Sequence, residues 1–219
     1  MSGTELAIFA ATRAALTRHP EQRYGRAVAH IAVFHHAQGL TAGVRSFADR
    51  LAADGHDVAV PDLYDGATFE TLPEGVAHAE QLGFGSLIER GRTAVVDMPG
   101  ETVYIGFSLG VLPAQMLAQT RSGARGAVLC HGCVPPAEFG GPWPAGVALQ
   151  IHAMENDDVF VSGGDLEAAR EVVDGTDHAE MFLYPGDEHL FADHSLPSYE
   201  RASAERLIER VRRFVAEIK

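Results

Sequence analysis

The residues whose types and spacing best fit a reaction are five consecutive ones, Gly106-Phe107-Ser108-Leu109-Gly110, which match the pattern G-x-S-x-G. An apolar run at 103–107 predicts a buried strand before the serine, and residues 109–120 predict a helix after it. A serine on such a tight turn is exposed for nucleophilic attack, and the helix N-terminus puts positive dipole where an oxyanion forms. The alternative is a chance match at an ordinary strand-to-helix turn.

A nucleophilic serine needs a base, and the base needs a carboxylate that orients it. His189 follows a predicted strand at 180–184 after a short loop, and Asp157 and Asp158 follow a predicted strand at 147–153. Ligands bind beyond the carboxyl ends of parallel strands, so we expect these side chains near Ser108. The chain order serine, aspartate, histidine is typical of α/β-hydrolases. The residues alone leave the choice between the two aspartates open.

Other candidates for the site are histidines at strand ends and the single tryptophan. His36 follows a predicted strand at 28–34 together with His35, and His131 follows one at 126–130. We expect His36 and His131 to line a substrate pocket, with hydrogen-bonded buried histidines as the alternative, and we predict no metal site. Trp143 lies between two prolines. It either roofs the pocket or caps an edge of the sheet, and we include it among the candidate pocket residues.

The two cysteines, Cys130 and Cys133, have C-x-x-C spacing. A redox pair of this type is expected at the start of a helix, where the dipole lowers the pKa of one thiol. Two prolines follow at 135 and 136, so the sequence favours two ordinary buried thiols. Zinc binding is disfavoured because the chain has no second C-x-x-C motif.

Strands and helices alternate along the chain, which predicts a mostly parallel central sheet with helices on both faces. Residues 1–27 predict a helix or a peripheral strand, and residues 28–219 are expected to form a single α/β-hydrolase domain. Predicted strands lie at 28–34, 57–60, 103–107, 126–130, 147–153 and 180–184, and predicted helices at 43–54, 87–98, 109–120, 166–173 and 199–218.

The excess of acidic over basic residues limits the kinds of partner that the chain is expected to bind. The 219 residues include 30 acidic and 17 basic ones, giving a net charge of −13, so the chain lacks the clustered cations of a nucleic-acid binder. No secretory signal is recognised, because the apolar stretch at 6–11 has no basic segment before it. The longest uncharged run, 102–120, contains polar residues and fits a strand plus a helix better than a membrane span. We expect a cytoplasmic protein without nucleic-acid or membrane partners.

Several segments resemble the dienelactone hydrolase family, a compact branch of the α/β-hydrolases, over about 29–214. They are F-H-H-A-Q-G-L at 34–40, A-D-R-L-A-A-D-G-H-D-V-A-V-P-D-L-Y at 48–64, G-F-S-L-G at 106–110, H-A-M-E-N-D-D at 152–158 and Y-P-G-D-E-H-L-F at 184–191. The resemblance implies an α/β-hydrolase fold with no large lid domain.

The resemblance also implies roles for particular residues. It gives Ser108 the nucleophile position, Asp157 the acid position and His189 the base position. The oxyanion hole would be the backbone N–H groups of Leu109 and Ala37. The best-known members of the family carry cysteine where this chain has Ser108, and glutamate where it has His36, so the chain departs from their pattern at both positions.

Together these observations predict a serine hydrolase of small carboxylic esters or lactones that works through an acyl-enzyme on Ser108. No cofactor is implied, and the expected partner is a small-molecule ester or lactone. The oligomeric state stays open, a homodimer being one option. The alternative function is a non-catalytic α/β-hydrolase-like binding protein.

Overall fold

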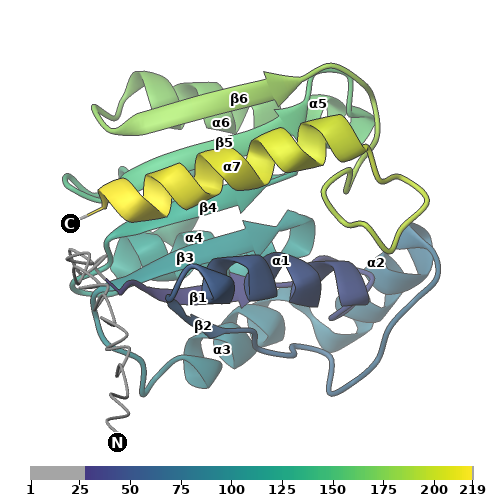
Figure 1. Cartoon of the computed structure of the whole chain (residues 1–219), viewed down its shortest axis with the longest axis horizontal. Coiled ribbons are helices and arrows are strands. Elements are labelled where there is room, and N and C mark those ends of the chain that lie inside the picture. Colours follow the sequence, from purple (N-terminus) through teal and green to yellow (C-terminus); the bar gives the residue numbers. More distant parts are fainter. Residues whose placement is uncertain (1–27, 219) are drawn as a thin grey trace, which may run out of the picture.

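The computed structural model describes residues 28–218, so the prediction for residues 1–27 lies outside the described residues. At its centre is a sheet of six parallel strands in the order β2-β1-β3-β4-β5-β6. All their carboxyl ends lie at one edge of the sheet, on the right in Figure 1. The strands are β1 His30–Phe34, β2 Asp57–Ala59, β3 Thr102–Phe107, β4 Gly126–Cys130, β5 Ala148–Met154 and β6 Ala179–Tyr184.

Helices cover both faces of this sheet (Figure 1). On one face lie α1 Ala42–Ala53 and α7 Arg201–Glu217, and on the other α3 Phe84–Ala94, α4 Val111–Thr120 and α6 Asp165–Asp174. The remaining helices are α2 Leu72–Leu82, α5 Asp158–Ser162 and the 3₁₀ turns η1 Ser108–Gly110 and η2 Pro136–Phe139. Both α2 and α5 lie at the carboxyl edge, where they flank the loops that end the strands.

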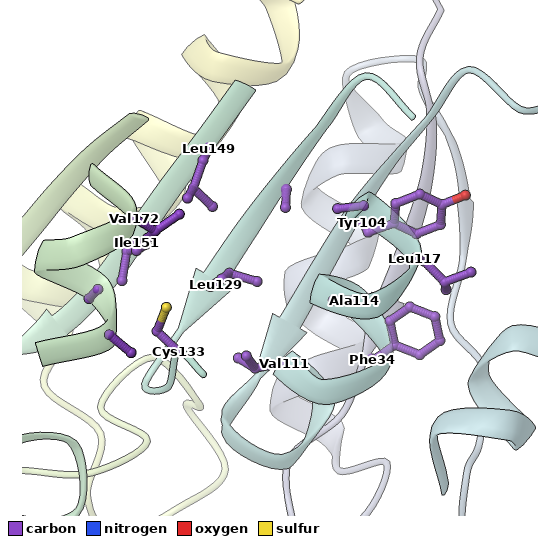
Figure 2. Close-up of a cluster of buried hydrophobic side chains, with 14 of the residues drawn as sticks. Phe34, Tyr104, Val111, Ala114, Leu117, Leu129, Cys133, Leu149, Ile151 and Val172 are labelled. Atoms are coloured by element: carbon purple, nitrogen blue, oxygen red, sulfur yellow. The ribbon is translucent and has the colours of Figure 1, made fainter. Parts of the chain in front are cut away.

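The strands are buried on both faces, which explains their nearly continuous apolar sequences. In β1, Ile31 and Val33 pack with α1 and α7, whereas Phe34 packs with α3 and α4. Figure 2 shows this second layer, in which Phe34 and Tyr104 lie near Leu117 of α4. Each fully buried Leu, Ile or Phe side chain contributes about 1.5–3 kcal/mol relative to an exposed one, so burial in the two layers stabilises the packing of the helices on the sheet.

The strand predictions match the structure closely, and the helix predictions less so. The predicted strand at 126–130 coincides with β4, and the predicted helix at 43–54 differs from α1 by one residue at each end. The helix predicted at 87–98 is found at Phe84–Ala94, and the helix predicted at 109–120 begins as the 3₁₀ turn η1. Helices α2 and α5 were absent from the prediction.

The connections between strands carry only helices and loops that pack on the sheet, and within residues 28–218 none forms a large lid. No helix in this part of the chain is long and apolar enough to cross a membrane.

Candidate active site

The turn after β3 holds Ser108 in a backbone conformation that is unusual for a residue with a side chain. Its φ is +47°, in the left-handed region. A Cβ at Gly106 would lie 2.3 Å from the carbonyl oxygen of Gly110, and a Cβ at Gly110 would lie 2.3 Å from the carbonyl oxygen of Phe34. Both glycines of the G-x-S-x-G pattern are therefore required by close backbone approach, and the strained turn presents Ser108 at the carboxyl edge of the sheet.

His189 reaches Ser108 from the loop that follows β6. Its Nε2 lies 2.9 Å from the Ser108 hydroxyl, and its Nδ1 lies 2.7 Å from Oδ2 of Asp157. With Nδ1–H donating to the carboxylate, Nε2 is free to accept the serine proton. The next residue, Leu190, has a φ of +64°. The backbone is thus in a strained conformation beside the candidate base as well as at the serine.

The structure separates the two candidate acids. Asp157 is fully buried and is the N-cap of α5, where its Oδ1 accepts the backbone N–H groups of Val159 and Phe160 at 3.0 and 3.4 Å. Its other oxygen, Oδ2, is thereby held toward His189. Asp158 is the first residue of the helix and is exposed. Asp157, and not Asp158, is the carboxylate that the fold brings to His189.

The two expected oxyanion donors lie on either side of the serine turn. Leu109 is in the first turn of η1, where backbone N–H groups have no intrahelical acceptor. Ala37 lies in the loop after β1, beside the turn because β1 pairs with β3 so that Phe34 faces Gly106. The Ala37 N–H has no acceptor within residues 28–218.

Helix α2 fixes the position of the Ala37 loop. A Cβ at Gly75 of α2 would lie 2.0 Å from the carbonyl oxygen of Ala37, so the helix backbone packs directly on this peptide. The Tyr64 hydroxyl donates to the Gly75 carbonyl at 3.3 Å, which ties the helix to the loop after β2. An element missing from the sequence prediction therefore supports one of the predicted oxyanion donors.

His36 lies behind the site instead of lining an open pocket, contrary to our expectation. It is fully buried, its Nδ1 accepts the Gln38 N–H at 3.2 Å, and its Nε2 lies 2.8 Å from Oδ2 of Asp193. Since Nδ1 is an acceptor, Nε2 carries the proton and donates it to the carboxylate. Both ring nitrogens are used by the protein, and the pair links the Ala37 loop to the loop that carries His189. Nothing in the local sequence around either residue signals this long-range pair.

Asp193 collects further hydrogen bonds in the same buried place. The Thr41 hydroxyl donates to Oδ2, and the backbone N–H and the hydroxyl of Ser195 donate to Oδ1 at 2.8 and 2.6 Å. A Cβ at Gly43 would lie 1.7 Å from Oδ1, so α1 approaches the carboxylate without a side chain. Burial alone would raise the pKa of Asp193, but the hydrogen bonds from His36, Ser195 and Thr41 outweigh it and lower that pKa to about 2.

We expect Asp193→Asn to lower the free energy of unfolding by about 1–3 kcal/mol at neutral pH, because its amide NH₂ would face donors instead of accepting from them. The pKa of Asp193 is lower in the folded chain than the usual 3.9 or so of an unfolded one, so the carboxylate stabilises the fold above about pH 4 and this contribution is lost as pH falls toward 2.

Urea unfolding of the parent protein and of Asp193→Asn between neutral pH and pH 3 measures the difference. Asp187→Asn, exposed in the same loop, is the matched control. Equal unfolding free energies for the Asp193 and Asp187 variants would contradict the assignment.

His131 packs directly behind the candidate base. Only 1% of it is exposed, its φ is +63°, and its ring lies edge-on to the ring of His189 at 5.7 Å between centroids. Burial lowers the pKa of His131 well below its usual value, and neither ring nitrogen has a hydrogen-bond partner among the described residues. His131 therefore contacts the base through its ring, but it is covered and does not form an open pocket wall as we expected.

Trp143 lies at the opposite edge of the sheet, which corrects its prediction as a pocket residue. Its indole N–H donates to the carbonyl of Val147 at 2.7 Å, one residue before β5 begins. The chain has by then crossed from the carboxyl end of β4 back to the amino end of β5. Trp143 caps this amino edge, far from the serine turn.

The remaining candidates also have structural roles. His35 is buried, with Nδ1 2.8 Å from the carbonyl oxygen of His36 and Nε2 accepting the Leu63 N–H at 3.0 Å. Cys130 and Cys133 are free and buried in different core layers, and burial raises the pKa of both thiols, which disfavours a redox pair. Within residues 28–218, no three His, Cys, Asp or Glu side chains lie close enough together to hold a metal ion.

Two clefts open beside the Ser108–His189 pair. One, of about 270 Å³, is lined by His189 together with Gln38, Glu70 and Glu188. The other, of about 550 Å³, is mainly apolar and includes Leu112, which lies one helical turn after Ser108. Neither cleft could be predicted from the sequence, because their walls come from loops and helices that are distant in the chain.

A serine on a strained turn after a central strand, with a histidine and an aspartate from later strand ends of a parallel sheet, defines an α/β-hydrolase. The model of the dienelactone hydrolase family matches residues 14–219, and the chain belongs to this family. The predictions of the fold class, of the family and of an ester or lactone hydrolase are thereby confirmed. No curated protein sequence matches the chain.

Solved structures show the same fold at low sequence identity. A dienelactone hydrolase-like promiscuous phosphotriesterase, P91, from metagenomic libraries is 19% identical, with a TM-score of 0.67 over 87% of this chain and 86% of that one. A protein described as a putative dienelactone hydrolase from Klebsiella pneumoniae is 17% identical, with a TM-score of 0.67 over 90% of each chain. An esterase from Pyrobaculum calidifontis is 15% identical, with a TM-score of 0.60 over 86% of this chain and 76% of that one.

Proposed function

We propose that the protein hydrolyses small carboxylic esters or lactones through an acyl-enzyme on Ser108. The observation that carries this proposal is the continuous hydrogen-bonded chain from Ser108 through His189 to the buried Asp157, with links of 2.9 and 2.7 Å. Membership of the dienelactone hydrolase family supports it independently.

The first half of the reaction forms the acyl-enzyme. The Ser108 oxygen attacks the carbonyl carbon of the ester as its proton passes to Nε2 of His189. The oxygen of the tetrahedral intermediate receives hydrogen bonds from the N–H groups of Leu109 and Ala37. The intermediate then collapses, the carbon–oxygen bond to the alcohol breaks, and His189 returns its proton to the leaving oxygen. In a lactone this step opens the ring.

The second half releases the acid. Water attacks the acyl carbon while His189 accepts one of its protons, and the intermediate collapses to free Ser108 and the carboxylic acid. Asp157 keeps the proton of His189 on Nδ1 and stabilises the imidazolium that forms twice in the cycle. No residue beyond these is required for proton transfer.

The chain differs from the best-known members of the family at Ser108 and at His36, and the two differences are consistent with each other. A serine passes its proton to the histidine, so it has no need of the glutamate that stands beside the cysteine of the best-known members. Here the equivalent position is His36, whose ring is hydrogen-bonded to the Asp193 carboxylate and to the Gln38 backbone N–H. This residue supports the loop and takes no part in activating the nucleophile.

A turnover screen tests the proposal. The panel contains p-nitrophenyl esters of graded chain length and several lactones, and also one phosphotriester because P91 is described as a promiscuous phosphotriesterase. We expect a burst of p-nitrophenolate with the activated esters, since their good leaving group makes acylation faster than the attack of water on the acyl-enzyme. Failure of every carboxylic ester and lactone, with the folded protein shown to be intact, would overturn the proposal and favour a non-catalytic binding role.

A further inference from the structure

The loops that surround the candidate site carry no lysine or arginine. Besides the serine turn at 108–110, five connections leave the carboxyl ends of the strands, at 35–41, 60–71, 131–147, 155–157 and 185–200. Together they contain ten Asp and Glu residues and neither a lysine nor an arginine. One-signed charge at a cleft with low-dielectric walls changes the local concentration of charged ligands and their association rates by about 10- to 1000-fold.

The cleft that contains His189 has this charge in its wall. Glu70 and Glu188 line it, and its other polar side chains, apart from His189, are the uncharged Gln38 and Ser198. A neighbouring groove of about 560 Å³ continues from it, since both are lined by Glu70, Leu196 and Pro197. Neither hollow has an arginine or lysine in its lining.

The second cleft offers apolar surface in place of cations. Phe84, Ile88, Leu112, Val134 and Phe139 line it, and its charged side chains are Glu138 and Asp165. Asp165 accepts the Cys133 N–H at 3.0 Å, which joins this cleft to the loop after β4. The walls suit a hydrocarbon group and contain nothing that would bind a carboxylate.

Arginines reach these loops from helices, Arg45 of α1 and Arg90 of α3 among them. Burial is the main cause that lowers the pKa of His35 and the charge of Arg45 adds to it, but Arg45 lines none of the three hollows, and Arg90 is already paired. The guanidinium of Arg90 in α3 donates to the carbonyl of Leu63 and to Oδ2 of Asp65, both at 2.8 Å. Its charge is therefore directed to a carboxylate of the loop after β2. It does not line any of the three hollows beside the site.

We propose that the site selects esters and lactones whose acyl and alcohol parts carry no negative charge and have apolar groups. This inference rests on the proposed function and adds the substrate class. A carboxylate on the substrate would enter the cleft beside the exposed carboxylates of Glu70 and Glu188, which repel it with an energy that salt screens. The same field repels the carboxylate product once water has released it, which favours its departure.

The test uses three substrates that differ at one terminal group. They are p-nitrophenyl hexanoate, the mono-p-nitrophenyl ester of adipic acid and p-nitrophenyl 6-(trimethylammonio)hexanoate, with spontaneous hydrolysis subtracted from each rate. At low salt we expect kcat/KM for the anionic ester to be at least about tenfold below that for the neutral ester, with the cationic ester not below it. Raising NaCl to about 1 M should shrink the difference, because the Debye length falls to about 3 Å.

Two matched double variants locate the effect. Glu70→Gln with Glu188→Gln removes two charges at the cleft, and we expect it to raise the ratio of anionic to neutral kcat/KM several-fold. Asp97→Asn with Asp177→Asn removes two exposed charges just before β3 and β6, at the amino edge of the sheet. We expect this control to leave the ratio at the parent value.

The outcomes separate this inference from the proposed function. Equal kcat/KM for anionic and neutral esters, with turnover lost in Ser108→Ala, would overturn the inference alone. A slower anionic ester whose ratio responds neither to salt nor to the cleft variant would also overturn it, because shape and not charge would then discriminate. If the neutral ester is not hydrolysed, or is hydrolysed equally well by Ser108→Ala, the proposed function fails first.

Discussion

Ser108→Ala is expected to remove almost all ester turnover, with kcat falling by about 10⁶-fold as for the loss of the nucleophile in other serine hydrolases. The hydroxyl is the group that forms the acyl-enzyme, and it is the group whose proton Nε2 of His189 is placed to accept. The measurement is the steady-state rate on the best ester of the panel, with single-turnover kinetics to exclude trace parent enzyme. Ser122→Ala, an exposed serine at the amino edge of the sheet, is the matched control and should retain full activity.

The strain at this position provides a second readout. Because φ at Ser108 is +47°, Ser108→Gly relieves a left-handed conformation and is expected to be more stable than Ser108→Ala by about 1 kcal/mol. Both variants should be equally inactive, so activity and stability separate at one residue. Residual turnover within about tenfold of the parent in either variant would mean that the nucleophile lies elsewhere.

Asp157→Asn is expected to reduce kcat by up to ~10⁴-fold, while Asp158→Asn has a much smaller effect. The amide NH₂ of asparagine would face Nδ1 of His189 in place of an acceptor oxygen at 2.7 Å. The histidine would then turn to the tautomer that protonates Nε2, which cannot take the Ser108 proton. Steady-state rates of the two variants on one ester measure the contrast.

Asp157→Asn is expected to change the hydrogen bond to His189 without disrupting helix α5. Asparagine keeps a carbonyl oxygen for the Val159 and Phe160 amides and is as good an N-cap as aspartate, so α5 should survive in Asp157→Asn. Far-ultraviolet circular dichroism and the unfolding midpoint check this. Equal loss of activity in the two variants, or a larger loss in Asp158→Asn, would show that the wrong carboxylate has been assigned.

The strands were predictable because each is buried on both faces and reads as an apolar run with little ambiguity. Helix α2 was missed because only Gly75 and Ala79 are buried in it, which leaves no apolar stripe. Its beginning was nevertheless readable, since Thr71 and Glu74 form a capping box and Pro73 occupies the first turn. Helix α5 has five residues, too few for a period to appear, and its one signal is the N-cap Asp157.

The site also contains residues that were predictable from the sequence and residues that were not. Residues that lie directly at strand ends, such as Ser108 and His189, were predictable because the parallel topology brings strand ends together. The choice of Asp157 over Asp158 depended on the family resemblance. His36 and Asp193 are 157 residues apart in the sequence, and only the folded chain brings Nε2 of His36 to 2.8 Å from Oδ2 of Asp193. Trp143 was misplaced because a crossover connection starts at the carboxyl edge and finishes at the amino edge, and sequence spacing does not say where along it a residue lies.

Covalent capture of the nucleophile tests the central claim most directly. The folded protein is treated with a fluorophosphonate at neutral pH, its intact mass is recorded, and the modified peptide is sequenced by tandem mass spectrometry. The account predicts one adduct per chain on Ser108, no adduct in Ser108→Ala, and slow labelling in Asp157→Asn because the base has lost its orienting carboxylate. An unmodified parent protein, or an adduct on a different residue with Ser108 untouched, would contradict it.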